Sequence, residues 1–110
     1  MYSTDEPWGN EPLTSYPAIA EDVDRLVDGV VDRLGQLDVL VNSAGINIRH
    51  QVEALTASDF RQVIDVNLTG PFLCMREVFP IMKKAGGGRI VNIGSISAQR
   101  SRVNMAPYTA

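Results

Sequence analysis

The feature that most constrains the fold is an alternation of helical and strand patterns in which both strands end in small polar residues. Residues 37–42 and 89–94 contain short, branched apolar runs of the kind found in buried strands. A stretch with helical periodicity precedes each run, from Glu21 to Leu34 and from Ala57 to Lys84. The order helix, strand, helix, strand is typical of a parallel α/β sheet. The sequence therefore predicts two adjacent parallel strands joined through the second helix.

Both helical stretches carry boundary signals. The apolar face of the first consists of Val23, Leu26, Val27, Val30, Val31 and Leu34. Gly35 follows this face, at a position where helices often end in glycine. The second stretch opens with Thr56 and Asp59 at capping-box spacing. Within it, Pro71 has no N–H for the carbonyl of Asn67, so we expect the helix to kink there.

Composition limits the function classes. The chain has 110 residues, of which 45% are hydrophobic and 21% charged, as in a folded domain. Its net charge of −3 leaves no basic excess for binding nucleic acid. No apolar run approaches the roughly 20 residues that cross a bilayer, and the start does not resemble a signal peptide. The single cysteine, Cys74, cannot form an internal disulfide, so we expect a cytoplasmic protein.

The chain divides into an irregular leader, residues 1–17, and an α/β part, residues 18–110. The leader contains Pro7, Trp8, Pro12 and Pro17 and shows no periodicity. The α/β part offers only two strands, although their apolar runs require neighbours on both edges and helices on both faces. We therefore expect an incomplete domain, or one that another chain completes.

Polar groups at the strand ends are candidates for binding, because open parallel sheets bind ligands at the carboxyl ends of their strands. Residues 42–45 and 94–97 qualify, although asparagine, serine and glycine also simply terminate strands. Asn67 stands apart because helical spacing places it on the apolar stripe with Val63 and Ile64. A buried amide costs about 1–3 kcal/mol unless its hydrogen bonds are met. Asn67 either patches the gap left by Pro71 or takes part in chemistry.

These segments together form one ordered pattern. In chain order they are Asn42, Ser43, Ala44 and Gly45 after a strand, Asn67 within residues 66–70, Ser95 after residues 88–94, and Tyr108 thirteen residues beyond Ser95. From about residue 21 to residue 110 this pattern resembles the short-chain dehydrogenase/reductase family, whose members have a Rossmann fold and use NAD or NADP. The resemblance implies a partial Rossmann-type, doubly wound parallel α/β sheet that lacks the first βαβ portion and the C-terminal part. It also implies an oxidoreductase that interconverts a secondary alcohol and a ketone.

The resemblance further implies catalytic roles for three residues. Tyr108 would be the general acid/base that exchanges a proton with the substrate oxygen. Ser95 would hydrogen-bond that oxygen, and Asn67 would hold a water in the proton relay. These roles suit the chemistry, since hydride transfer to a carbonyl builds negative charge on oxygen. In the family a lysine four residues after the tyrosine makes the phenol a useful base, and that position lies beyond Ala110.

Cofactor binding is implied for Asn42, Ala44 and Gly45, which match the motif that lines the adenosine side of NAD or NADP, and for Tyr108. Ser43 replaces the usual second asparagine of that motif. Residues 1–36 contain neither the glycine-rich phosphate turn nor the residue that selects between the two cofactors. The choice between NAD and NADP therefore stays open.

Within the family the pattern looks most like gluconate 5-dehydrogenase and related sugar-acid or polyol dehydrogenases, and 3-oxoacyl-carrier-protein reductases look similar. An alternative from another class is a non-catalytic module. In that case the helix from Ala57 to Lys84 would pair with the same helix of another subunit, as the family's homo-oligomers do. Because the phosphate turn and the lysine are missing, we expect these 110 residues alone to be inactive.

Other sites find less support in the sequence. Ser95 lacks the second glycine of a hydrolase nucleophile elbow, and His50 is the single histidine. His50 and Cys74 have no metal-ligand spacing, so we expect no metal. Three loop arginines could hold a substrate carboxylate or could simply be solvated: Arg49, Arg100 and Arg102.

Overall fold

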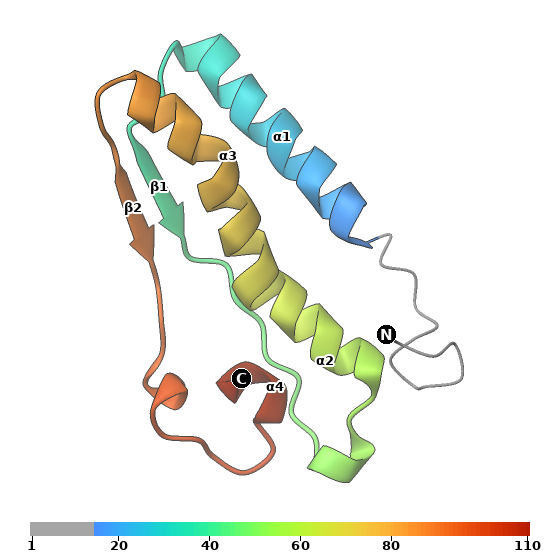
Figure 1. Cartoon of the computed structure of the whole chain (residues 1–110). Coiled ribbons are helices and arrows are strands. Elements are labelled where there is room, and N and C mark those ends of the chain that lie inside the picture. Colours follow the sequence, from blue (N-terminus) through green and yellow to red (C-terminus); the bar gives the residue numbers. More distant parts are fainter. Residues whose placement is uncertain (1–14) are drawn as a thin grey trace. The chain divides into compact units, whose positions relative to one another are not determined.

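A computed structural model of the chain describes residues 15–110. In chain order its elements are α1 (Ser15–Leu34), β1 (Val39–Asn42), the 3₁₀ turn η1 (Val52–Ala54), α2 (Ala57–Ile64), the π-helical turn η2 (Asp65–Thr69), α3 (Gly70–Lys84), β2 (Arg89–Asn92), the 3₁₀ turn η3 (Ile96–Ala98) and α4 (Ala106–Thr109) (Figure 1). The described residues form two compact units. Residues 44–68 and 94–110 make up the first unit, and residues 15–43 and 69–93 make up the second.

The two strands pair in parallel within the second unit, as predicted. The aligned pairs are Val39 with Arg89, Leu40 with Ile90, Val41 with Val91 and Asn42 with Asn92. The pairing extends past β2, because the N–H of Ile93 donates to the carbonyl of Asn42 at 3.0 Å. Each strand has four residues, so both are shorter than the predicted runs. The α/β class with adjacent parallel strands is confirmed.

The core of the second unit lies where α1 packs against α3 and α3 packs against β1 (Figure 1). Its buried side chains are Val23, Val27, Leu73, Val78 and Met82. Cys74 packs against this core, and burial raises the pKa of its thiol. The predicted apolar face of α1 is only partly buried, since Leu26 is 63% exposed and Leu34 is 73% exposed. Helix α1 packs against α3, and this contact buries a narrower part of its apolar face than the sequence predicted.

The sheet is covered on one face by the described residues. Leu40 packs against the core, and its aligned partner Ile90 points to the same side. Val39, Val41 and Val91 point to the other side, where they are 56%, 54% and 44% exposed. The sequence pattern predicted cover on both faces, and residues 15–110 supply it on one.

Helix α1 begins earlier than the sequence pattern indicated. It starts at Ser15, so residues 15–17 of the expected irregular leader are helical, while residues 1–14 lie outside the described part. Pro17 falls in the first turn, where the missing N–H breaks no helical hydrogen bond and proline is tolerated. In residues 15–110 there is no helix whose length and apolar character would let it cross a membrane.

The second helical stretch runs from Ala57 to Lys84 with a π-helical turn inside it. The capping box is confirmed: the N–H of Asp59 donates to Oγ1 of Thr56 at 3.0 Å, and the N–H of Thr56 donates to Oδ2 of Asp59 at 3.2 Å. The disturbance expected at Pro71 takes the form of the π turn η2 immediately before it. The wider turn accommodates a proline that cannot donate a hydrogen bond.

Candidate active site

Ser95 lies just beyond β2, in extended backbone that caps η3. Its Oγ accepts a hydrogen bond from the N–H of Ser97 at 3.2 Å. Ser97 is only 7% exposed, so this bond is partly shielded from water. Because Oγ serves as the acceptor, the hydroxyl proton of Ser95 remains available for a ligand. The carboxyl end of β2 thus offers one hydrogen-bond donor, the hydroxyl of Ser95.

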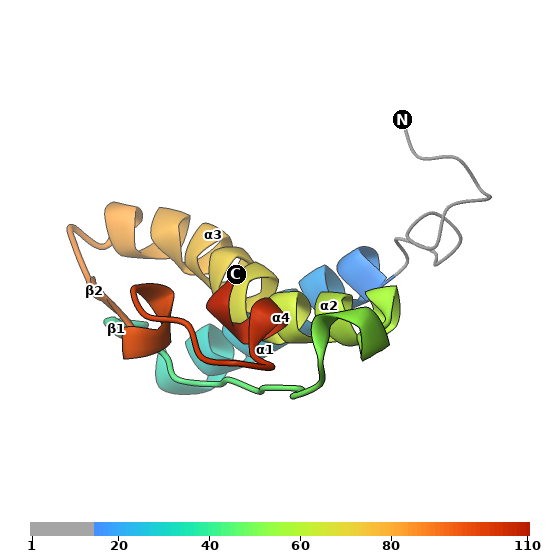
Figure 2. The same cartoon turned by 90° about the horizontal axis from the view of Figure 1, so that it is seen from below.

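Tyr108 lies in α4, a helix of one turn that contacts both η3 and α2. Figures 1 and 2 show α4 beside the first turns of the long helix. Pro107 is fully buried and Met105 is 8% exposed, whereas Tyr108 is half-buried. The backbone of α4 is therefore anchored while the tyrosine keeps access to solvent. The contact between α4 and η3 brings the helix that contains Tyr108 to the turn that Ser95 caps.

Asn67 binds the backbone of Ile46 through both ends of its amide. The N–H of Ile46 donates to Oδ1 of Asn67 at 2.8 Å, and Nδ2 of Asn67 donates to the carbonyl of Ile46 at 2.8 Å. The amide thus holds the loop that follows β1 and does not patch the gap at Pro71. Pro71 has no N–H to donate to the main-chain carbonyl of Asn67, so this carbonyl is the candidate group for a relay water.

Ala44 and Gly45 belong to the same unit as the three predicted catalytic residues. Both are exposed and small. A Cβ built on Gly45 would lie 3.6 Å from Oδ1 of Asn67, which is an ordinary van der Waals distance. Gly45 therefore lies beside Asn67 without steric strain. The backbone of Ala44 and Gly45 is therefore accessible near the side-chain amide of Asn67.

Asn42 lies in the other unit, at the end of β1, and is tied to a residue that the sequence analysis did not single out. Its Nδ2 donates to Oδ1 of Asn92 at 2.7 Å, and Nδ2 of Asn92 lies 3.5 Å from Sδ of Met75. This amide pair joins the carboxyl ends of the two strands. Both strands end in Val-Asn, and their parallel alignment was the signal that could have revealed the pair.

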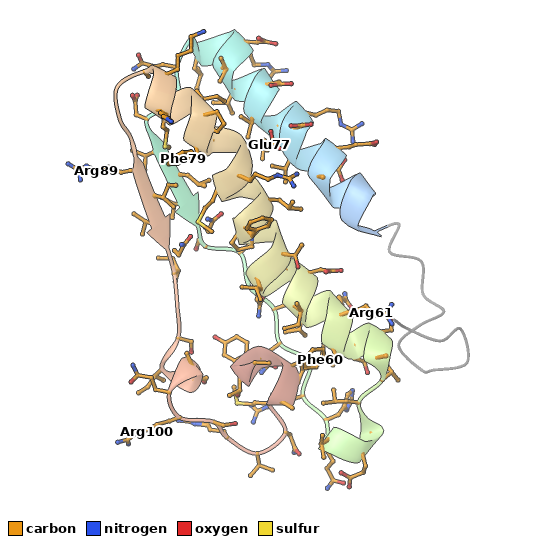
Figure 3. All side chains as sticks on the ribbon, viewed as in Figure 1. Phe60, Arg61, Glu77, Phe79, Arg89 and Arg100 are labelled. Atoms are coloured by element: carbon orange, nitrogen blue, oxygen red, sulfur yellow. The ribbon has the colours of Figure 1, made fainter. Side chains whose placement is uncertain are left out.

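The three loop arginines show no feature of a built anion site. All three are exposed, and within residues 15–110 none forms an ion pair. Arg100 extends away from α4 (Figure 3). This geometry favours the solvated interpretation for Arg100. In the same described stretch, no group of three or more His, Cys, Asp or Glu side chains is placed to hold a metal ion.

The sequence model of the short chain dehydrogenases matches residues 18–110. The chain belongs to the short-chain dehydrogenase/reductase family. The match includes Asn42, Asn67, Ser95 and Tyr108, whose placement is described above. The resemblance seen in the sequence is confirmed at the level of the family.

Individual relatives cover several activities. The chain is 40% identical to a 3-oxoacyl-[acyl-carrier-protein] reductase of Synechocystis sp. over 93 residues, which are 84% of this chain and 38% of that protein. It is 46% identical to trans-4-hydroxycyclohexanecarboxylate dehydrogenase of Sinomonas cyclohexanicum over 84 residues, 76% of this chain and 32% of that protein. The chain thus spans about a third of the length of these relatives.

Solved structures agree with the fold. NAD+-bound xylitol dehydrogenase matches with a TM-score of 0.76 and 35% identity, over 82% of this chain and 35% of that one. ElxO with NADP bound matches with a TM-score of 0.76 and 33% identity, over 82% of this chain and 37% of that one. The described residues therefore correspond to part of a Rossmann-like short-chain dehydrogenase.

Proposed function

We propose that these residues belong to an NAD(P)-dependent oxidoreductase that interconverts a secondary alcohol and a ketone. The observation that supports the proposal is the contact between α4, which contains Tyr108, and η3, which Ser95 caps. Two hydroxyl donors from neighbouring elements suit a substrate oxygen that gains negative charge.

The proposed reaction needs one proton and one hydride. The nicotinamide supplies the hydride to the carbonyl carbon when it is bound. Tyr108 gives its phenolic proton to the carbonyl oxygen, and in the reverse direction takes the proton back from the alcohol. Ser95 donates a hydrogen bond to the same oxygen and stabilises the developing charge. The carbonyl of Asn67 holds a water through which Tyr108 regains its proton from solvent.

The residues present fit the adenosine side of a nicotinamide cofactor. Ala44 and Gly45 are exposed and lack bulky side chains, so a planar ring system can approach their backbone. Asn42, which precedes them in the same motif, is assigned to the cofactor with them. The neighbours with bound NADP and NAD+ support this assignment and leave the choice of cofactor open.

For the substrate we propose a polyol or sugar acid, of the kind handled by gluconate 5-dehydrogenase. The likeness to xylitol dehydrogenase supports a polyol, and the relative named for a hydroxycyclohexanecarboxylate supports a hydroxy acid. A 3-oxoacyl thioester is the alternative, supported by the Synechocystis relative. We also propose that the protein is cytoplasmic.

A second candidate function is pairing with another subunit through the long helix. Phe72 and Phe79 on α3 are 53% and 58% exposed. The guanidinium of Arg76 lies 5.9 Å from the centre of the Phe72 ring, so this face combines aromatic and cationic groups. A homo-oligomer joined through residues 57–84 would cover these rings.

The test is expression of the complete open reading frame that contains this chain. We expect a lysine codon two positions beyond Ala110. We also expect either oxidation of a polyol or sugar acid with NAD+ or NADP+, or reduction of a 3-oxoacyl thioester with NADH or NADPH. The Tyr108→Phe variant is the control for background oxidation. A reading frame without this lysine, combined with no binding of either cofactor, would favour the helix-pairing module.

A further inference from the structure

We infer that Ser101 and Thr109 form a hydroxyl pair that positions Tyr108. The inference rests on the proposed function, in which the phenol of Tyr108 must meet a substrate oxygen. Ser101 lies in the loop between η3 and α4, and Thr109 directly follows Tyr108. Their role is positioning, because neither is assigned a contact with substrate or cofactor.

The two hydroxyls are within hydrogen-bond distance. Oγ of Ser101 lies 3.1 Å from Oγ1 of Thr109 and donates to the carbonyl of Arg102 at 3.2 Å. A serine hydroxyl has one proton. Since Ser101 gives this proton to Arg102, Thr109 is the donor in the pair. The resulting chain of two hydrogen bonds runs from α4 to the backbone of the preceding loop.

Tyr108 sits between two anchors of different kinds. On one side Pro107 is fully buried, and on the other side Thr109 is tied to Ser101. Helix α4 has only four residues, too few for a stable helix on its own. The orientation of Tyr108 therefore depends on both flanking contacts.

The backbone before α4 also favours this arrangement. Asn104 has a φ of 65°, a left-handed conformation that asparagine tolerates better than most residues. This residue reverses the chain so that the loop containing Ser101 returns past α4. The hydroxyl pair closes the segment from Ser101 to Thr109, and Tyr108 lies within this segment.

The pair is tested by removing each hydroxyl in the 110-residue chain. The variants are Ser101→Ala, Thr109→Val and Thr109→Ser, with Ser58→Ala as a control, since Ser58 is an exposed helical serine that forms no side-chain hydrogen bond with the described residues. Solution NMR measures the side-chain couplings of Thr109 and the ring signals of Tyr108. The Tyr108→Phe variant assigns these ring signals. Melting temperatures show whether a substitution also changes the stability of the whole chain.

We expect Ser101→Ala to raise the share of alternative Thr109 rotamers about fivefold, the effect of losing one hydrogen bond. Thr109→Val is expected to shift the Tyr108 ring signals, Thr109→Ser to restore them, and Ser58→Ala to change neither. Unchanged Thr109 couplings in Ser101→Ala, or Tyr108 signals that respond equally to Thr109→Val and Thr109→Ser, would overturn the inference. If either Ser101→Ala or Thr109→Val unfolds the protein, the other variant still tests the inference.

The catalytic consequence is read in the protein from the complete reading frame. Thr109→Val is expected to lower kcat while leaving the Kd of the cofactor unchanged, and Thr109→Ser to recover kcat. Equal kcat in all three proteins would overturn the positioning role. A failure of the proposed function would differ, because the unsubstituted protein would then bind no nicotinamide cofactor while the NMR result on the pair would stand.

Discussion

At the scale of single residues, the hydrogen bonds that Ser95 and Asn67 already make within the protein determine what each can offer a ligand. Ser95 uses its oxygen as an acceptor and keeps its proton, whereas Asn67 has both amide ends bound to Ile46. These two polar residues therefore differ in what they can offer a ligand. Ser95 has a hydroxyl proton to donate to a ligand, and the side chain of Asn67 holds a loop.

Substitution of Tyr108 or Ser95 in the complete protein should reduce turnover strongly. Tyr108→Phe removes the proton donor and keeps the ring, so we expect kcat to fall by about 10²–10⁴-fold with the cofactor still bound. Ser95→Ala should cost a comparable factor through the lost donor. The double variant should be little worse than Tyr108→Phe, because the groups act together. Steady-state kinetics and cofactor titration check this, and near-normal kcat in both single variants would contradict the assignment.

Substitution of Asn67 should first affect stability. Asn67→Leu leaves the N–H and the carbonyl of Ile46 without their partner, and we expect the free energy of unfolding to fall by about 1–3 kcal/mol. Asn47→Leu is the control, since Asn47 is exposed in the same loop. Urea denaturation of both variants measures the difference. Equal stability of the two would show that the bonds to Ile46 contribute nothing measurable.

At the scale of elements, the turn between α3 and β2 depends on close packing. Gly86 and Gly87 have φ values of 95° and 150°, and the N–H of Gly87 donates to the carbonyl of Met82 at 2.8 Å. Gly88 then passes so close to Met82 that a Cβ would lie 2.5 Å from its Cγ and 3.0 Å from its Cβ. The chain can enter β2 beside the helix because this position has no side chain.

Gly88→Ala should therefore destabilise the second unit. We expect a loss of about 1–3 kcal/mol, because the new methyl overlaps the base of the Met82 side chain and not only its flexible end. Gly29→Ala is the matched control: Gly29 lies inside α1 with nothing within 4 Å, and alanine there should stabilise by up to about 1 kcal/mol. Thermal unfolding followed by circular dichroism compares the two. A Gly88→Ala variant as stable as the parent would refute the close approach.

The contact between α1 and α3 should respond to pH. A hydrogen bond with Asp24 is the main cause that raises the pKa of Glu77, followed by partial burial and the charge of Asp24, while Arg76 opposes the rise. Figure 3 shows Glu77 on the side of α3 that faces α1. A carboxyl whose pKa is higher in the folded state stabilises the fold when protonated. This contribution is present at low pH and is lost as pH rises through the raised pKa.

Glu77→Gln keeps the hydrogen-bonding capacity and removes the charge. We expect this variant to be more stable than the parent at neutral pH, and the difference to shrink below the ordinary pKa of a glutamate. Melting temperatures of both proteins from about pH 4 to about pH 7 measure it. A stability difference that is constant with pH would mean that Glu77 has the same pKa in the folded and unfolded states.

At the scale of the whole molecule, the open face of the sheet is the main departure from a closed α/β layer structure. Val39, Val41 and Val91 lie on this face, and the described residues leave them about half exposed. Exposed apolar strand faces favour association. The fold therefore predicts how the 110-residue chain behaves in solution.

We expect the 110-residue chain to associate more as its concentration rises, and Val41→Lys to reduce this association. A lysine on the open face adds a charge where an apolar contact would form. Gln36→Lys adds the same charge at an exposed position outside the strand and serves as the control. Sedimentation velocity over a concentration series measures the change. Equal association in both variants would indicate that another surface drives it.

The sequence by itself determined the local elements and their order. The capping box at Thr56 and Asp59 and the disturbance before Pro71 depend on residues a few positions apart, so periodicity and backbone hydrogen bonding predict them. The parallel strands pair over a longer separation, and the order helix, strand, helix, strand predicts them. The ordered pattern that includes Ser95 and Tyr108 also indicates the family, which the match over residues 18–110 confirms. The catalytic roles of these two residues stay predictions.

Only the tertiary structure decided the partners of the polar side chains. Asn67 binds Ile46 across 21 positions, and Asn42 binds Asn92 across 50. It also decided that Leu26 is exposed although it lies on the apolar face of α1, since burial depends on which neighbour packs there. Contacts of this kind arise from where the chain folds back on itself, and no local pattern in the sequence encodes that return.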